Sequence, residues 1–282
     1  MDRRSVIRNL SVASATPLLP LPSISMPETT KRKFQHSVCR WCYKDIPLEE
    51  LCDMAKDSGV QSIELLNPPD WDIVFGRGLK VALSNGSSLG IPKGFNDPQY
   101  HGQLQKEIKE VIGKAVDKGV PQVIVFSGNR LGIPDQMGLE NCARGLAPLV
   151  SMAEEGNITI VMELLNSKIN HLDYQCDRTP WGVRLVDMVN SPNFKLLYDI
   201  YHMQIMEGDV IRTITDYKDY IAHYHTAGVP GRHEINDTQE LNYHAIMNAI
   251  ADTGFSGYVA QEFIPVGDPR KSLKEAIKIC SV

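Results

Sequence analysis

Four residues able to bind a metal ion close four successive apolar runs in the second half of the sequence. The runs ITIVME, KLLYD, IAHYH and YVAQE end at Glu163, Asp199, His225 and Glu262, respectively. Three carboxylates in one dry site would repel one another and partly protonate, and a bound cation relieves that repulsion. One imidazole with three carboxylate oxygens suits Mn²⁺, Mg²⁺ or Co²⁺ better than a structural zinc ion. The pattern therefore predicts a site for one divalent cation.

The alternation of side chains along a strand separates these ligand candidates from their neighbours. His223 shares a face with His225 but lies one layer deeper, which favours a hydrogen-bonded core histidine. Gln261 is out of phase with Glu262 and should point outward. A single strand-end carboxylate can instead cap the following helix or pair with an arginine. The repetition on four consecutive runs favours the shared metal site.

Two residues just beyond these runs are candidates for contact with a substrate. His202 either bonds the backbone of its own loop or supports the metal site or the substrate. Arg232 lies in the next loop, where its planar guanidinium can bind a carboxylate or phosphate or simply meet solvent. The adjoining His233 stays unassigned.

The elements that must position these residues alternate regularly along the chain. Helical patterns end in DSGV, DKGV, EEGN and DTGF, where each glycine is expected at the C′ position before an apolar strand. Strands are predicted near 34–39, 61–66, 80–84, 121–127, 158–163, 194–199, 220–226 and 257–262. Helices are predicted near 47–58, 101–118, 135–155, 180–190, 205–216, 241–253 and 268–280, with a weak helical pattern at 69–78.

Eight strands alternating with helices over about 250 residues predict a (β/α)₈ TIM barrel, which is an α/β fold. Catalytic groups of such a barrel project from the C-terminal ends of the strands, where the ligand candidates stand. A doubly wound open sheet would normally have a glycine-rich turn after its first strand, and RWCYKD (40–45) contains none. One catalytic domain is therefore expected over residues 31–282.

The composition limits the class of partner. The chain of 282 residues is 43% hydrophobic and 22% charged, with a formal net charge of −5 and scattered Lys and Arg. This balance argues against nucleic acid or an anionic membrane surface as the main partner. A small-molecule substrate is expected, and a homo-oligomer stays open.

The first thirty residues differ from the rest. DRRSVIR precedes NLSVASATPLLPLPSIS, whose three prolines exclude an uninterrupted membrane-spanning helix of about 20 apolar residues. A charged start with an arginine pair and a modest apolar stretch predicts a twin-arginine export signal and a periplasmic location. The alternative is a disordered tail on a cytoplasmic protein.

Six cysteines are too few and too scattered for a disulfide scaffold. Cys39 and Cys42 have C-x-x-C spacing, but no second pair completes a zinc site, and the motif follows a strand rather than opening a helix. Packing cysteines are expected, while a disulfide stays open for an exported protein.

Four stretches resemble the hydroxypyruvate isomerase branch of the xylose-isomerase-like barrels. They are MELLN (162–166), LYDIYHMQIMEGD (197–209), HYHTAGVPGRHEIN (223–236) and AQEF (260–263). The resemblance covers nearly the whole predicted barrel and implies one divalent cation bound by the four ligand candidates. Glu163 and Glu262 would then be the acid/base pair. Apart from the resemblance, we expect His202, Arg232 and Asn166 to bind the substrate.

The resemblance leaves the substrate open. Hydroxypyruvate isomerases tend to have Gln in an I-A-D context at the position of His225, whereas ketose 3-epimerases of the same superfamily have His. The first expectation is interconversion of hydroxypyruvate and 2-hydroxy-3-oxopropanoate, or of a similar small hydroxy-keto acid, by proton transfer through an enediolate. The second is isomerisation or epimerisation of a keto-sugar or keto-glycoside. The third is a non-catalytic sugar-binding protein.

Trinuclear-zinc endonucleases share this barrel but need additional histidines from the third and fourth strands. Those strands end in LSN (83–85) and FSG (126–128), which contain none. The acidic charge balance is also unsuited to a phosphate backbone, so nucleic acid is not expected as the substrate.

Overall fold

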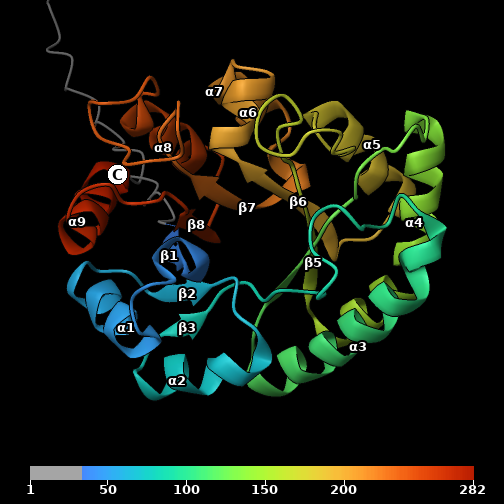
Figure 1. The fold of residues 1–282 in the computed structure, drawn as a ribbon, viewed down its shortest axis with the longest axis horizontal. Coiled ribbons are helices and arrows are strands. Elements are labelled where there is room, and N and C mark those ends of the chain that lie inside the picture. Colours follow the sequence, from blue (N-terminus) through green and yellow to red (C-terminus); the bar gives the residue numbers. More distant parts are fainter. Residues whose placement is uncertain (1–33) are drawn as a thin grey trace, which may run out of the picture. The chain divides into compact units, whose positions relative to one another are not determined.

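The computed structural model describes residues 34–282, and eight parallel strands form the centre of this region (Figure 1). They are β1 (Gln35–Cys39), β2 (Ser62–Glu64), β3 (Lys80–Val81), β4 (Gln122–Val125), β5 (Thr159–Glu163), β6 (Phe194–Asp199), β7 (Ile221–Thr226) and β8 (Tyr258–Gln261). The strand order is β3-β2-β1-β8-β7-β6-β5-β4. Ser84, beyond β3, forms a parallel bridge with Val123 of β4, so the two ends of the sheet meet. The predicted TIM barrel is confirmed, and the predicted export signal lies outside the described residues.

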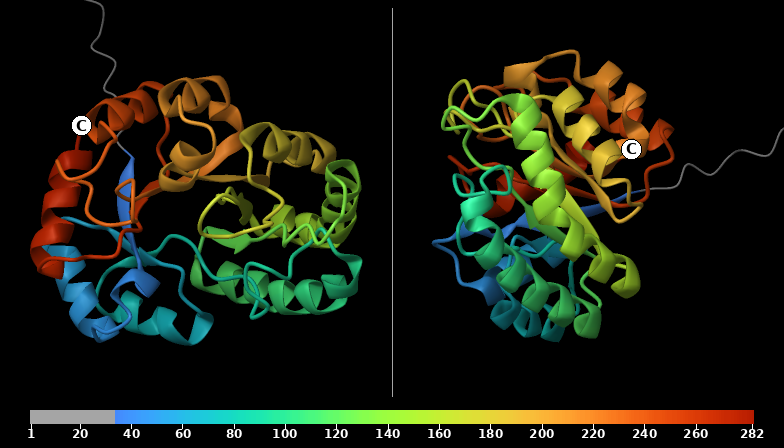
Figure 2. Two further views of the ribbon diagram at one scale, coloured as in Figure 1. Left: turned by 45° about the horizontal axis from the view of Figure 1, so that its top comes forward. Right: turned by 90° about the vertical axis from the view of Figure 1, so that its right-hand side faces the viewer.

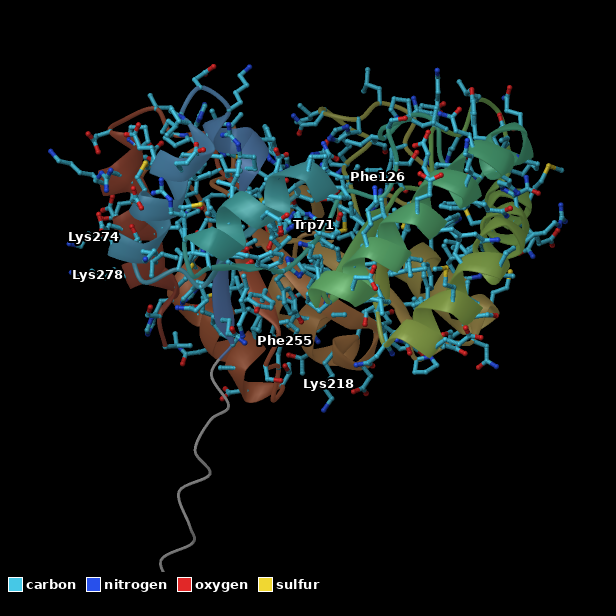
Figure 3. The ribbon with its side chains drawn as sticks, turned by 90° about the horizontal axis from the view of Figure 1, so that it is seen from below. Trp71, Phe126, Lys218, Phe255, Lys274 and Lys278 are labelled. Carbon is cyan, nitrogen blue, oxygen red and sulfur yellow. The ribbon has the colours of Figure 1, made fainter. Side chains whose placement is uncertain are left out.

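Helices surround the strands as an outer layer (Figures 1 and 2). They are α1 (Leu48–Asp57), α2 (Trp71–Gly76), α3 (His101–Lys118), α4 (Asp135–Gly156), α5 (Thr179–Val189), α6 (Ile200–Met206), α7 (Val210–Asp216), α8 (Tyr243–Asp252) and α9 (Pro269–Cys280). The longer helices, such as α1, α3 and α4, each bury one apolar stripe, as the period of the sequence predicts. The opposite face of a helix is polar: on α9, Lys274 and Lys278 extend outward from the edge of the molecule (Figure 3). Within residues 34–282, no helix has the length and apolar character needed to cross a membrane.

The predicted helix over 205–216 is wrong, because two short helices replace it. α6 begins immediately after β6, and α7 begins only at Val210. Between them Gly208 has φ +66° and Asp209 has φ +42°, a left-handed turn that stops an α-helix. At the start of α6, Asp199 Oδ1 accepts a hydrogen bond from His202 N at 2.9 Å. Asp199 therefore caps the helix and also belongs to the predicted ligand set.

The glycine of EEGN does not have the predicted role. Gly156 is the last residue of α4, and Asn157 takes the left-handed conformation with φ +53°. Asparagine tolerates this conformation better than other side chains do. A Cβ atom on Gly156 would lie 2.4 Å from Val116 Cγ2 of α3, so the two helices approach each other closely at this glycine. The other three phrases follow the prediction, with positive φ at Gly59, Gly119 and Gly254.

An apolar cluster fills the β3 to β6 side of the barrel interior beneath the strand ends. It contains Leu83, Ile124, Val161 and Leu197, all buried. A register shift between β6 and β7 pairs Leu197 with His223, and consequently Asp199 with His225. The apolar residues and this register together hold the polar strand ends at one level.

Candidate functional site

The four predicted ligands converge at the C-terminal ends of β5 to β8. One ligand atom from each of Glu163, Asp199, His225 and Glu262 lies within 4.8 Å of the others. All four side chains are buried. Each comes from a different strand, so the short apolar strands beneath them fix their spacing. The sequence-predicted set is thus a single spatial cluster.

His225 carries the atom that best fits a cation. Its Nδ1 lies 2.7 Å from Glu262 Oε2 and 3.4 Å from Glu163 Oε1. Although these distances are short, the angles complete no hydrogen bond, and Nδ1 is a buried nitrogen without a partner. Burial alone would lower the pKa of His225, but the negative charge of Glu262 raises it well above its usual value. A cation would replace that proton and satisfy Nδ1, so the residues fit a divalent ion.

Glu163 and Glu262 have opposite electrostatic environments. Burial raises the pKa of Glu163 to about 7, aided by the charge of Glu262 and opposed by His225. Burial would also raise the pKa of Glu262, but Arg232 and His225 hold it well below its usual range. Trp41 Nε1 donates a further hydrogen bond to Glu262 Oε1 at 2.7 Å. Two carboxyl groups set apart in this way can act as an acid and a base.

Arg232 lies inside the site and not at the surface. Its Nη2 donates to Asp199 Oδ2 at 2.9 Å and also contacts Glu262 Oε2. Its guanidinium carbon lies 4.9 Å from the Tyr201 ring centroid and 5.5 Å from that of Trp41. Nε of Arg232 is buried without a hydrogen-bond partner. The guanidinium therefore keeps an unused donor in the site.

His202 is a buried ring held between two donors. Asn166 Nδ2 lies 2.6 Å from its Nδ1, and Arg232 Nη1 lies 2.6 Å from its Nε2. Burial, with the charges of Arg232 and His171, lowers the pKa of His202 well below its usual value. Because a neutral imidazole accepts at one nitrogen only, one of the two donors is left without an acceptor.

Asn166 occupies a different place from the other predicted substrate contacts. It is fully buried, and its Oδ1 accepts from the backbone N–H groups of Ile169 and Asn170. Both ends of its amide are thus used within the protein, and it orders the loop that follows β5. Asn170 and His171 of that loop line the cleft described next.

A cleft of about 670 Å³ opens above the four ligands. The side nearest the ligands is polar and includes Glu163, His202, Arg232 and Glu262. The opposite side is apolar and includes Leu65, Ile91, Ile124 and Phe126. Leu65 and Arg232, one on each side, have the left-handed φ values +56° and +60°. Such strain in non-glycine residues is typical of functional sites.

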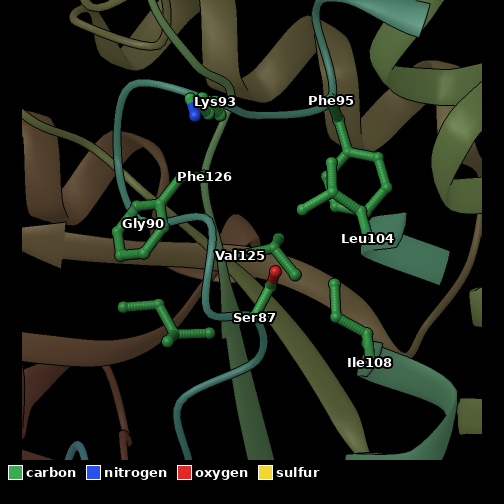
Figure 4. A pocket seen from close by; sticks show the side chains of 9 residues that line it. Ser87, Gly90, Lys93, Phe95, Leu104, Ile108, Val125 and Phe126 are labelled. Carbon is green, nitrogen blue, oxygen red and sulfur yellow. The ribbon is translucent and has the colours of Figure 1, made fainter. Parts of the chain in front are cut away.

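A second, much smaller pocket lies behind the apolar wall. Figure 4 shows it between Ser87, Phe95, Leu104, Ile108 and Phe126. Its volume of about 10 Å³ has room for about one water molecule. Of these two cavities, the larger cleft is the one with room for a substrate.

Glu64 is the site residue that the sequence reasoning missed. It ends β2, is fully buried, and its Oε1 lies 2.8 Å from His225 Nε2 and 2.9 Å from His223 Nε2. His223 is a hydrogen-bonded core histidine, as predicted, and its second nitrogen meets Gln122 Oε1 at 2.7 Å. The signal was present in QSIELL, where a lone carboxylate lies between an apolar residue and two leucines, as Glu163 does in VMELL.

The cysteines are packing residues, as predicted. All six are free thiols. Burial raises the pKa values of Cys39 and Cys42 well above the usual value, which keeps both thiols protonated and unreactive. The residues after β3 and β4 at the rim are Ser84 and Ser127, so no histidine extends the metal cluster on that side of residues 34–282.

A closed barrel with an acidic ligand set at its strand ends defines a class of TIM-barrel proteins. The family model described as "Xylose isomerase-like TIM barrel" matches residues 52–281, and the chain belongs to this family. A human protein named putative hydroxypyruvate isomerase is 26% identical over 242 residues, which cover 83% of this chain and 80% of the human one.

Two solved structures illustrate how widely the fold is used. AP endonuclease, family 2, from Brucella melitensis has a TM-score of 0.77 at 23% identity, over 85% of this chain and 97% of its own. The 3-keto-D-glucoside 4-epimerase from E. coli has a TM-score of 0.73 at 18% identity, over 87% of this chain and 98% of its own. At these identities the likeness concerns the fold alone.

Proposed function

We propose that the protein is a metal-dependent isomerase that moves a proton between neighbouring positions of a hydroxy-keto substrate. The unpartnered Nδ1 of buried His225, facing two carboxylates, is the observation that carries this proposal. The divalent cation, Mn²⁺, Mg²⁺ or Co²⁺, would be held by Glu163, Asp199, His225 and Glu262. When bound, it polarises the substrate carbonyl and stabilises the negative charge of the enediolate.

Glu163 and Glu262 would perform the proton transfer. They stand at the ends of β5 and β8, with β6 and β7 between them, so they can reach a substrate from two sides. One carboxylate takes the proton from the carbon next to the carbonyl and forms the enediolate. Return of a proton to the neighbouring carbon completes an isomerisation, and delivery from the opposite carboxylate to the same carbon completes an epimerisation.

Hydroxypyruvate, or a similar small hydroxy-keto acid, is the first substrate class that we propose. Arg232 has a buried Nε without a partner, and its planar fork suits a carboxylate. His202 contacts Arg232 Nη1 at 2.6 Å and lines the same cleft, so it can hold the guanidinium in place beside the substrate. The human relative named putative hydroxypyruvate isomerase supports this class.

A keto-sugar or keto-glycoside is the second candidate, which the size of the cleft favours. Pockets of about 300–1,000 Å³ usually enclose ligands much larger than a three-carbon acid. Here the cleft measures about 670 Å³ and has an apolar side opposite the ligands. The structural neighbour that acts on a 3-keto-D-glucoside, and the histidine at position 225, agree with this second class.

A substrate screen tests both classes. The full chain and a form that begins at Lys31 would be loaded with Mn²⁺, Mg²⁺ or Co²⁺ and offered hydroxypyruvate, ketoses and 3-keto-glucosides. Turnover of one class, lost on chelation and restored by the metal, is the expected result. Metal-loaded protein that binds these compounds without turnover would replace the isomerase with a sugar-binding protein.

We also propose that residues 1–30 direct export by the twin-arginine route. The arginine pair Arg3-Arg4 precedes a modest apolar stretch with small residues and three prolines. A reporter fused after Thr30 should reach the periplasm, and replacement of both arginines by lysine should retain it in the cytoplasm. Equal export of both fusions would exclude this route.

A further inference from the structure

Glu64 is the charged residue directly beneath the proposed ligands, and no step of the proposed reaction uses it. Its side chain has 0% exposure, and a single oxygen, Oε1, receives both His223 Nε2 and His225 Nε2. The other oxygen, Oε2, is buried without a hydrogen-bond partner. Burying an ionised carboxylate costs free energy unless hydrogen bonds compensate for the lost solvent. For Glu64, that compensation comes entirely through Oε1.

Gln122 fixes the direction of the bonds in this cluster. Its Nε2 donates to Ala222 O at 3.0 Å, which turns its Oε1 toward His223 Nδ1 at 2.7 Å. Both ring nitrogens of His223 therefore face oxygen atoms, those of Gln122 and Glu64. The pair of Gln122 and His223 thus holds the Glu64 carboxylate from the side away from the cleft.

The hydrogen-bond partner of His225 likewise determines which of its ring nitrogens carries the proton. Because Glu64 Oε1 accepts at 2.8 Å, His225 carries a proton on Nε2, and Nδ1 is the nitrogen that can offer a lone pair to an ion. Nδ1 is also the nitrogen that faces Glu163 and Glu262. Histidines that bind metals usually donate their other N–H to such a carboxylate, which orients the ring and makes it more basic.

We propose that Glu64 is a positioning residue, which fixes the ring and the protonated nitrogen of His225 so that Nδ1 faces the cation. This inference rests on the proposed metal site. It gives the first half of the barrel a direct part in metal affinity, although all four ligands belong to the second half.

A second ion among Cys39, Glu64 and His225 is the competing interpretation, since these three could also form a ligand group. Two ligands about 2.1 Å from a tetrahedral ion would lie roughly 3.4 Å apart. The two contacts of Glu64 Oε1 with the imidazoles are 2.8 and 2.9 Å long, which are hydrogen-bond distances. Cys39 Sγ is more remote, at 3.7 Å from Glu64 and 3.9 Å from His225. The geometry favours hydrogen bonds over a second ion.

Two variants of similar volume separate the carboxylate's role from packing. Glu64→Gln keeps an acceptor oxygen but loses the charge, and Glu64→Met removes the acceptor. We expect the Mn²⁺ dissociation constant to rise about 10- to 100-fold in Glu64→Met and less in Glu64→Gln, as for other supports of metal ligands. Asp177→Asn is the matched control, because it exchanges a buried carboxylate bound to Arg130 for an amide away from His225. Its Mn²⁺ affinity should stay unchanged.

A spectroscopic measurement tests the positioning itself. The proton on His225 Nε2 should give a slowly exchanging low-field signal in ¹H–¹⁵N spectra of both metal-free and Zn²⁺-loaded protein, assigned with His225→Gln. Glu64→Gln should keep the signal, and Glu64→Met should lose it or shift it strongly. If Glu64→Met does not fold, the test rests on Glu64→Gln alone. Wild-type Mn²⁺ affinity of the Glu64→Gln protein would then contradict the proposal.

The Mn²⁺ affinities and the ¹H–¹⁵N spectra together separate this inference from the proposed function. Wild-type protein that binds no Mn²⁺ would overturn the metal-dependent isomerase, while the metal-free spectra would still test the bond between Glu64 and His225. Conversely, Glu64→Met with the wild-type signal and the wild-type Mn²⁺ affinity would overturn the positioning role and leave the isomerase intact. Mn²⁺ bound at a stoichiometry of two, with one ion lost in Glu64→Met, would replace the hydrogen bonds with a second metal site.

Discussion

The two halves of the barrel contribute different parts of the site. Strands β5 to β8 end in three carboxylates and an imidazole, all buried and within reach of one ion. Strands β2 to β4 and the loops after them present Leu65, Ile91, Ile124 and Phe126 to the same cleft. One half thus supplies charge and the other supplies shape. Chemistry and substrate size can therefore change independently in this fold, with Glu64 as the exception that connects the halves.

The largest expected effect concerns the charged half. Glu163→Gln and Glu262→Gln should each reduce kcat by about 10²–10⁴-fold, because a positioned acid or base contributes that much. Metal binding should persist, with lower affinity, when measured by calorimetry with Mn²⁺. Glu110→Gln, an exposed position on α3, is the control and should keep wild-type kcat. Turnover that survives both replacements would assign the proton transfer to other groups.

The next effect concerns Arg232, the cation of the charged half. Arg232→Ala should reduce kcat/KM for hydroxypyruvate and other acidic substrates by about 10- to 100-fold, since a hydrogen bond to a charged group contributes about 1.5–3 kcal/mol. Neutral keto-sugars should lose less. Steady-state kinetics on one acidic and one neutral substrate provide the measurement. An equal loss on both would mean that Arg232 serves the metal ligands Asp199 and Glu262 and not the substrate carboxylate.

A smaller effect should distinguish the apolar half. Phe126→Ala and Ile91→Ala should raise KM for a keto-glycoside by about 10-fold, because each removes apolar contact worth about 1.5 kcal/mol. KM for hydroxypyruvate and the Mn²⁺ dissociation constant should stay unchanged. Met137→Ala, an exposed apolar residue of α4, is a suitable control. A rise in KM for hydroxypyruvate as well would show that the two halves do not act separately.

The smallest effect is on stability. The pKa of Glu163 is raised to about 7, so its contribution to stability is complete at acidic pH and is lost as the pH rises from about 4.5 through about 7, when the buried carboxyl must ionise. A cation binds only the ionised form, so Mn²⁺ should raise Tm more above pH 7 than below it, by about 2–4 °C per kcal/mol. Melting curves with and without Mn²⁺ over this pH range measure the difference. If the metal-induced rise in Tm becomes smaller as the pH increases, the pKa of Glu163 is not raised as assigned here.

The sequence alone supported the prediction of the barrel and of four ligand candidates. Short apolar runs after glycine-terminated helices are local patterns, and the alternation of a strand places its final polar residue without knowledge of its neighbours. The same local logic failed for residues 205–216, where the left-handed Gly208 and Asp209 divide the helix. It also passed over Glu64, because a single carboxylate on a three-residue strand has no repeated pattern to mark it.

Only the tertiary structure decided which atoms meet. The register shift between β6 and β7 sets Asp199 beside His225, and no local pattern predicts such an irregularity. Glu64 and His225 are 161 residues apart in the chain, and closure of the barrel brings them to hydrogen-bond distance. The sequence therefore determined which residue types stand at the strand ends, because that depends on neighbours along one strand. The proton on Nε2 of His225 and the free Nδ1 depend on contacts across the barrel, so they emerge only when all eight strands are in place.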